Sequence, residues 1–196
     1  MAALAWSHEE NSRMSDDAQL SEPKEAVLPE GGMRIAAETL VTERLRALRR
    51  ALGRNVAPLD VVVRRTRPAS RRHLFEEACD LYWNELSWEE ITDEEMIGDR
   101  ELTEMVFPGL LALIDALLPS GESGGPDRKR ERRDVAHDFL LWLAARLVEL
   151  RNEKMTGNGD HARIRREAQV TDELIDLIAY RLYSLTAKEI EELQVH

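Results

Sequence analysis

Large apolar residues recur at intervals of three and four along most of this 196-residue chain, which is the spacing of an α-helix with one buried face. The spacing is clearest from Val135 to Leu150 and from Leu174 to Leu185. A chain of this length suits one compact domain. We therefore predict a mainly α fold, in which a single compact domain of five to seven helices spans residues 33–196.

Residues that start and stop helices divide this pattern into elements. Gly53 is placed to end a first helix that begins near Thr39, and Ser70 is a suitable N-cap for a second helix over 71–87. Pro108 is expected to begin a later helix, because proline is tolerated in the first helical turn and costly further along.

Other stretches lack the helical period. Residues 1–32 carry seven acids against two bases, with few large apolar residues, so we expect a disordered acidic tail there. Glycine-rich segments predict flexible loops at 119–126 and 156–160, on either side of the longest expected helix at 127–154. The β-branched run at 60–63 predicts a short strand or an extended arm.

The composition excludes several classes of protein. A formal charge of −11 argues against capture of the whole chain by nucleic acid or by an anionic membrane. No stretch approaches the roughly 18 uninterrupted apolar residues that a membrane span needs. The single cysteine, Cys79, excludes an internal disulfide and a cysteine-rich zinc site. We expect a cytoplasmic protein that does not act at a membrane.

The charges are segregated along the chain. Residues 44–72 contain ten arginines and one acid, whereas residues 76–99 contain ten acids and no base. A basic block of this kind is typical of a surface for phosphate, nucleic acid or an acidic partner. Alternatively, the two blocks face and neutralise each other within the fold. The arginine block consists of Arg44, Arg46, Arg49, Arg50, Arg54, Arg64, Arg65, Arg67, Arg71 and Arg72.

Few groupings in the sequence suit catalysis. Asp134 and His137 are spaced to lie on one helical face and are weak candidates for metal ligands, but a helical di-iron site needs two Glu-x-x-His motifs and further carboxylates. There is no glycine-rich phosphate loop. Neighbouring acids should raise the pKa of Cys79 and suppress its reactivity. We expect no cofactor and favour a protein that is not an enzyme.

Aromatic side chains gather in two places and are candidates for docking to a protein partner. Tyr82, Trp83 and Trp88 lie close together among polar residues, and Tyr180 and Tyr183 lie three positions apart. Tyrosine and tryptophan are enriched at the centres of protein interfaces. Core packing by an amphipathic helix explains the same residues equally well, so both interpretations stay open.

The segment 172–190 has a more distinctive order of residues. An acidic helix is followed by a turn and a second helix, and the residues that define this order are Tyr180, Leu182, Tyr183, Leu185, Thr186, Glu189 and Ile190. The segment resembles the closing segment of type IIG restriction–modification enzymes and related N6-adenine methyltransferases, which read Tyr-x-Leu-Tyr-Gly-Leu-Thr before a Glu-Glu-Ile helix. Ser184 stands where that family has glycine. None of the family's catalytic motifs is present, so the resemblance implies a detached helical accessory piece.

Independently of the resemblance, Thr186 and Glu189 predict a capping box for the last helix.

Three functions fit these patterns. The first is a non-catalytic helical accessory or adaptor protein that docks onto a larger partner in a DNA-modification or phage-defence system. The second is a helical homo-oligomeric interaction module with no nucleic-acid role, and the third is a metal-dependent helical enzyme that uses Asp134 and His137. We expect a protein partner, with nucleic acid as a further candidate through the arginine block, and leave the oligomeric state open.

Overall fold

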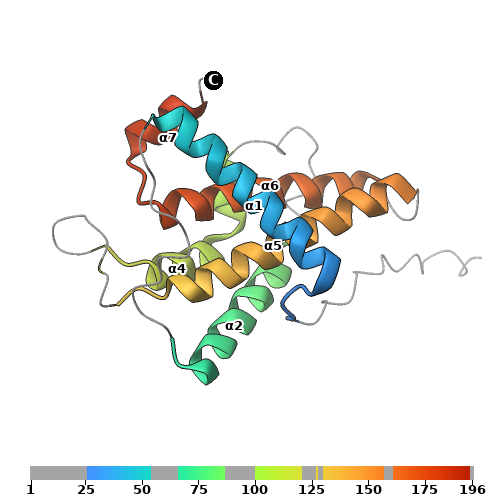
Figure 1. Ribbon diagram of the computed structural model, residues 1–196, viewed down its shortest axis with the longest axis horizontal. Helices are drawn as coiled ribbons and strands as arrows, with labels where there is room; N and C mark the ends of the chain where they lie inside the picture. The colour runs from blue at the N-terminus through green and yellow to red at the C-terminus, as the bar shows by residue number, and fades with distance from the viewer. Residues whose placement is uncertain are drawn as a thin grey trace, which may run out of the picture.

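The computed structural model describes residues 26–53, 66–86, 100–120, 127, 130–156 and 161–194, and these residues form seven α-helices without a β-strand (Figure 1). The helices are α1 (Gly31–Leu52), α2 (Pro68–Leu86), α3 (Arg100–Val106), α4 (Pro108–Leu117), α5 (Arg133–Thr156), α6 (His161–Leu182) and α7 (Ala187–Gln194). The predicted fold class, a single compact helical domain, is confirmed. The strand or arm expected at 60–63 and most of the expected acidic tail fall outside the described ranges.

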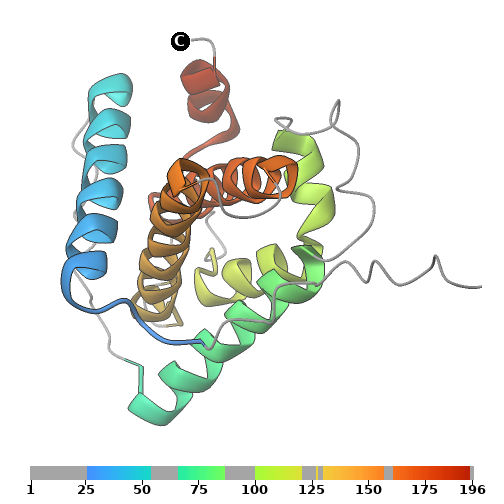
Figure 2. The same ribbon diagram turned by 90° about the vertical axis from the view of Figure 1, so that its right-hand side faces the viewer.

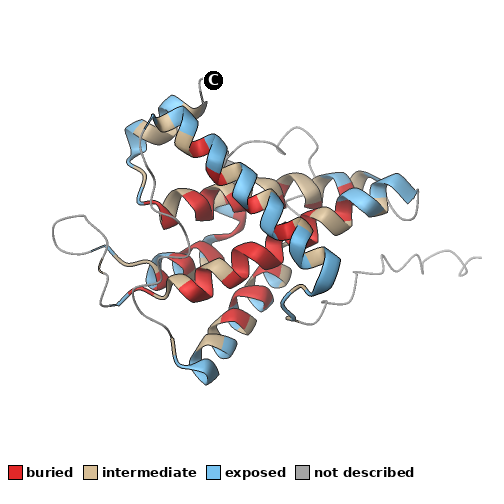
Figure 3. Ribbon diagram, viewed as in Figure 1, coloured by how far each residue is buried: buried red, intermediate tan, exposed pale blue. Residues whose placement is uncertain are grey.

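Helix α5 is the centre of the domain and contacts α1, α2, α4 and α6 (Figures 1 and 2). It is buried on nearly all sides, whereas α1 shows a long exposed face (Figure 3). Burying each large aliphatic or aromatic side chain contributes about 1.5–3 kcal/mol, so α5 supplies much of the stabilisation. The core residues predicted for this helix are all buried: Val135, Phe139, Leu140, Trp142, Leu143, Leu147 and Leu150.

The first helix begins at Gly31, earlier than the expected start near Thr39. Its first turns are largely exposed and start with two glycines, but Ala37 is fully buried and Met33 packs against the core. The end of α1 matches the prediction, because Gly53 has a φ of 60° and its N–H donates to the carbonyl of Arg50. Glycine is the residue that adopts this left-handed conformation without steric cost.

Proline begins two of the helices. Pro108 is the first residue of α4, as predicted. Pro68 likewise begins α2, so the expected N-cap at Ser70 is wrong, because Ser70 already lies within the helix. Proline suits this position since its missing N–H has no partner in the first turn.

The amide groups at the start of α4 are satisfied by Glu85 of α2. Its Oε1 accepts from the N–H of Gly109 at 2.7 Å, and its Oε2 accepts from the N–H of Leu110 at 3.0 Å. Glu85 is buried, and a carboxylate at a helix N-terminus also interacts favourably with the helix dipole. This contact positions α4 against α2.

The C-terminal end of α6 is a Schellman turn. The N–H of Leu185 donates to the carbonyl of Tyr180, and the N–H of Ser184, whose φ is 51°, donates to that of Arg181. The predicted capping box follows: the N–H of Glu189 donates to Oγ1 of Thr186 at 3.3 Å, and the N–H of Thr186 donates to Oε2 of Glu189 at 2.9 Å. Helix α7 then packs against α1.

Candidate functional site

Arg44 connects α1 to α6. Its Nη1 donates to Oδ2 of Asp176 at 2.9 Å, and its Nη2 donates to Oδ1 of Asp172 at 2.5 Å. Arg151 of α5 lies on the same carboxylate, with 3.8 Å between its Nη2 and Oδ1 of Asp172. A planar guanidinium matches two acceptors at once, so Arg44 serves as an internal tie between helices.

Burial raises the pKa of Asp176 to about 6, and the negative charges of Asp172 and Glu173 act in the same direction. The guanidinium of Arg44 opposes this rise without cancelling it. The second carboxylate oxygen of Asp176, Oδ1, is buried and has no hydrogen-bond partner.

Two buried carboxylates of α5 hold the start of α2. Asp134 accepts a hydrogen bond from the N–H of Thr66 at 2.8 Å and another from its hydroxyl at 2.7 Å. Asp138 accepts from Nε of Arg71 at 2.6 Å and from its Nη2 at 2.7 Å, which is a bidentate pair. Arg71, like Arg44, is therefore a member of the arginine block that pairs with carboxylates of another helix within the fold.

The Asp134–His137 pair is not assembled as a metal site. Both oxygens of Asp134 are occupied by Thr66, and the described residues contain no group of three or more His, Cys, Asp or Glu side chains that could hold a metal ion. His137 is half-buried, and burial lowers its pKa, with the positive charges of Arg71 and Arg34 adding to the effect. The nearby carboxylates of Asp138 and Glu38 act in the opposite direction.

A buried polar network joins α2, α5 and α6, and sequence reasoning did not find it. Nε of Arg146 donates to Oε1 of Glu167 at 2.6 Å, and both side chains are only 3% exposed. The Tyr82 hydroxyl lies 2.9 Å from that of Thr171, and Arg163 donates to the other oxygen of Glu167 at 3.2 Å. A charged residue in an apolar helical run was the available signal, since Arg146 follows Leu143, Ala144 and Ala145.

Aromatic rings surround this network. Tyr82 stacks on Phe107 and meets Trp83 and Trp142 edge-on, at centroid distances of 5.9, 5.1 and 5.2 Å. The guanidinium carbon of Arg146 lies 5.5 Å from the centre of the Trp83 ring, which is a cation–π contact. These contacts belong to the core of the domain.

The aromatic residues that were candidates for docking a partner lie in the core or against it, where the structure describes them. Tyr82 is fully buried and Tyr183 is 8% exposed, so neither presents a surface to a partner. Trp83 and Tyr180 are half-buried and pack against the core, and Trp88 is not among the described residues. The core-packing interpretation accounts for Tyr82, because its ring packs against Trp83, Phe107 and Trp142.

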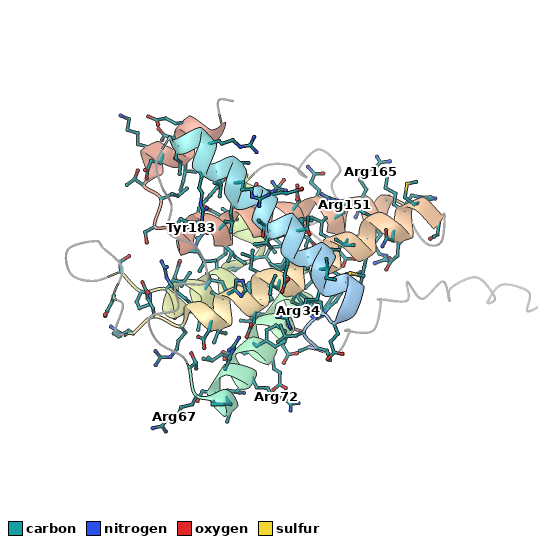
Figure 4. All side chains as sticks on the ribbon, in the orientation of Figure 1. Arg34, Arg67, Arg72, Arg151, Arg165 and Tyr183 are labelled. Carbon is teal, nitrogen blue, oxygen red and sulfur yellow. The ribbon has the colours of Figure 1, made fainter. Side chains whose placement is uncertain are left out.

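The remaining described members of the arginine block lie in two places. Arg46 and Arg50 are exposed on α1, and Arg49 is half-buried there. Arg67 and Arg72 are exposed at the N-terminal end of α2, far from the C-terminal end of α1 in both views (Figures 2 and 4). Arg54, Arg64 and Arg65 fall outside the described ranges.

In the described part of the chain, the acidic residues of the segment 76–99 are not the main partners of the arginine block. Arg72 pairs with Glu76 one turn along α2, with 2.7 Å between Nε and Oε1. Arg44 and Arg71 pair instead with carboxylates of α6 and α5. The described residues therefore support neither one continuous basic patch nor mutual neutralisation of the two blocks.

Cys79 is a core residue. It is 1% exposed, and burial raises the pKa of its thiol, with Asp80 and Glu76 contributing in the same direction. Burial is thus a larger cause than the neighbouring acids on which the sequence prediction was based.

No known protein family, curated protein or solved structure matches this chain significantly. Among the described helices, none combines the length and apolar character needed to cross a membrane.

Proposed function

We propose that this chain is a non-catalytic helical adaptor that docks onto a larger protein partner. What supports the proposal is the use of the buried polar side chains in the described part of the chain. All of them except Glu131, which pairs with the nearby Arg133, bond to a different segment and so fix the arrangement of the helices. These side chains are Glu85, Thr103, Asp134, Asp138, Arg146, Glu167 and Thr171. A fold that uses its buried polar groups in this way is a rigid scaffold, and its function then depends on its surface.

The exposed guanidinium groups favour an acidic surface on the partner. Arg46 and Arg50 occupy the exposed face of α1, and Arg67 and Arg72 occupy the start of α2. Arginine binds carboxylates through a planar fork. Because these two groups are far apart, they suit separate contacts with a large protein better than a continuous track along a nucleic acid.

The resemblance of segment 172–190 favours a partner from DNA modification or phage defence. Ser184 adopts a left-handed conformation, which glycine also tolerates, so the serine does not prevent a turn of this kind.

Cross-linking and affinity purification of the full chain from its native host test the proposal. We expect a methyltransferase, nuclease or helicase subunit to co-purify, and the charge reversals Arg46→Glu and Arg50→Glu together to abolish its recovery. Arg165→Glu, at an exposed arginine of α6 outside the block (Figure 4), is the matched control and should leave recovery unchanged. Recovery of a clean monomer with no partner would contradict the proposal.

A homo-oligomeric module is the second candidate. Val27, which precedes α1, is 55% exposed, and Ile35 near the beginning of α1 is 67% exposed. A second copy of the chain is the occupant that this alternative requires. Light scattering distinguishes the two candidates, because the alternative predicts a stable dimer that Ile35→Glu dissociates.

A further inference from the structure

Helix α7 is attached to the rest of the domain without a buried residue of its own. Its residues from Ala187 to Leu193 are exposed or half-buried (Figure 3). The helix packs mainly against α1 and lies beside the C-terminal end of that helix (Figures 1 and 2). An isolated helix of fewer than about 12 residues is marginal in water, so α7 depends on these contacts to stay in place.

Several polar contacts of α7 lie within the helix itself. The capping box joins Thr186 to Glu189, and Nζ of Lys188 lies 3.8 Å from Oε1 of Glu192. These contacts do not involve α1, so they stay intact when α7 separates from it. The apolar residues of α7 are Ile190, which is half-buried, and Leu193, which packs against the hydrophobic core. Substituting these two residues is therefore the direct way to loosen the helix.

The charges of α7 and of the adjoining part of α1 are opposite. Helix α7 carries three glutamates and one lysine, whereas residues 44–52 of α1 carry four arginines and no acid. Arg44 is engaged with α6, which leaves Arg46, Arg49 and Arg50 on this part of α1. Complementary charge of this kind selects a partner and sets its orientation.

Arg49 has hydrogen-bonding capacity that the fold does not use. The residue is half-buried, and its Nε is buried without a hydrogen-bond partner among the described residues. A buried donor left unsatisfied costs free energy, which a hydrogen-bonded carboxylate would recover. Leu45 and Leu48 lie on the same part of α1 and belong to the core, and Leu52 packs against it. The C-terminal half of α1 therefore combines positive charge with an apolar stripe.

We propose that the C-terminal half of α1 is a docking surface for an acidic amphipathic helix of the partner protein, and that α7 covers this surface until such a helix displaces it. This assignment of the partner's chemistry, which rests on the adaptor function proposed above, follows from α7 itself. The segment already seated on α1 is an acidic helix whose apolar residues, Ile190 and Leu193, lie three positions apart. Surfaces that bind an amphipathic helix recognise apolar residues at this spacing.

Binding of a synthetic peptide to the full chain tests the surface. The peptide has the sequence of residues 184–196 and a fluorescent label, and its anisotropy is followed as protein is added. The double variant Ile190→Glu with Leu193→Glu loosens the chain's own α7. It should bind the peptide roughly tenfold more tightly than the native chain, in which the tethered α7 competes at a high effective concentration. Absence of binding to the double variant, or equal binding to both proteins, would overturn the proposal.

Charge variants locate the binding on α1. Adding Arg46→Glu and Arg50→Glu to the loosened chain should weaken peptide binding roughly tenfold. Adding Arg165→Glu instead, at an exposed arginine of α6, is the matched control and should leave binding unchanged. A peptide with glutamine in place of its three glutamates should also bind more weakly. Equal effects of the reversals on α1 and on α6 would contradict the assigned surface.

Hydrogen exchange of the native chain keeps the proposal testable even if the loosened chain does not fold. The amides of α7 should exchange roughly tenfold faster than those in the middle of α6, because α7 opens without unfolding of the domain. Equal protection of the two helices would overturn the proposal. The purification from the native host is a separate test. Recovery of a partner without peptide binding removes only the assigned surface, and peptide binding without a partner removes only the adaptor function.

Discussion

Ser184 holds a backbone conformation that costs free energy for any residue with a side chain. Its φ of 51° lies in the left-handed region, where a Cβ atom crowds the following carbonyl at a cost of about 1–2 kcal/mol. The Schellman hydrogen bonds at the end of α6 hold the turn in this conformation despite that cost.

Ser184→Gly should therefore stabilise the protein by about 1 kcal/mol, partly offset by the greater freedom of glycine in the unfolded chain. Urea unfolding followed by circular dichroism measures the change as a higher midpoint. Ser184→Ala keeps the Cβ atom and should show no gain. An unfolding midpoint that is lower for the glycine variant than for the native chain would contradict this account.

Gly109 is required for a different reason. A Cβ atom at this position would lie 2.6 Å from Oε1 of Glu85, the oxygen that caps α4. Gly109→Ala should displace the carboxylate, leave amide groups of α4 unsatisfied and cost about 1–3 kcal/mol in the free energy of unfolding.

Gly32→Ala is the control for this substitution, because Gly32 lies in a helix with no atom within 4 Å of the added Cβ. It should leave stability unchanged or slightly improved. If both alanine variants unfold at the same denaturant concentration as the native chain, the cap provided by Glu85 does not contribute as described.

At the scale of elements, the Arg146–Glu167 pair ties α5 to α6. Removing Arg146 leaves the buried Glu167 carboxylate with only the partly exposed Arg163 as a charged partner, so we expect Arg146→Met to cost about 3 kcal/mol. The double variant Arg146→Met with Glu167→Leu should be more stable than the single variant, because no buried charge is then left alone. A double-mutant cycle by chemical denaturation measures the coupling, and simple additivity would contradict the pairing.

The helices themselves follow from local sequence. Gly53, Pro108 and the Thr186–Glu189 box mark helix ends through short-range chemistry, and the sequence predicted all three. The start of α1 was misplaced, because its first turns contain glycines, alanines and the exposed Ile35 and so give a weak apolar period, although Ala37 is buried.

The buried polar contacts were not predictable in the same way. Arg146 meets Glu167 across 21 residues, and Arg44 meets Asp172 across 128. No local spacing encodes which helices become neighbours, so the sequence revealed a block of arginines without showing that Arg44 and Arg71 point inward. The candidate site was for this reason less predictable than the fold.

For the whole molecule, the raised pKa of Asp176 links stability to pH. Its pKa is about 6 in the folded chain against 3.8 ordinarily, so the folded state binds more protons between these values. The stabilisation is fully present below about pH 4 and is lost as the pH rises through about 6.

Asp176→Asn should consequently be more stable than the native chain near pH 7.5, by an amount on the order of 2 kcal/mol. The advantage should shrink toward pH 4, where the native carboxyl is protonated. His137, whose lowered pKa acts in the opposite direction, is the same in both proteins and cancels in the comparison. Urea titrations of both proteins across this pH range measure the difference, and a constant difference would contradict the assignment.

The central position of α5 also has a consequence for synthesis on the ribosome. Helices α1 and α2 are made first, but the surface that buries them belongs to α5, more than 40 residues later than the end of α2. Their apolar faces stay exposed to solvent or bound to a chaperone until α5 leaves the exit tunnel. A ribosome stalled before that point carries a nascent chain without α5, so the domain completes its core only late in synthesis.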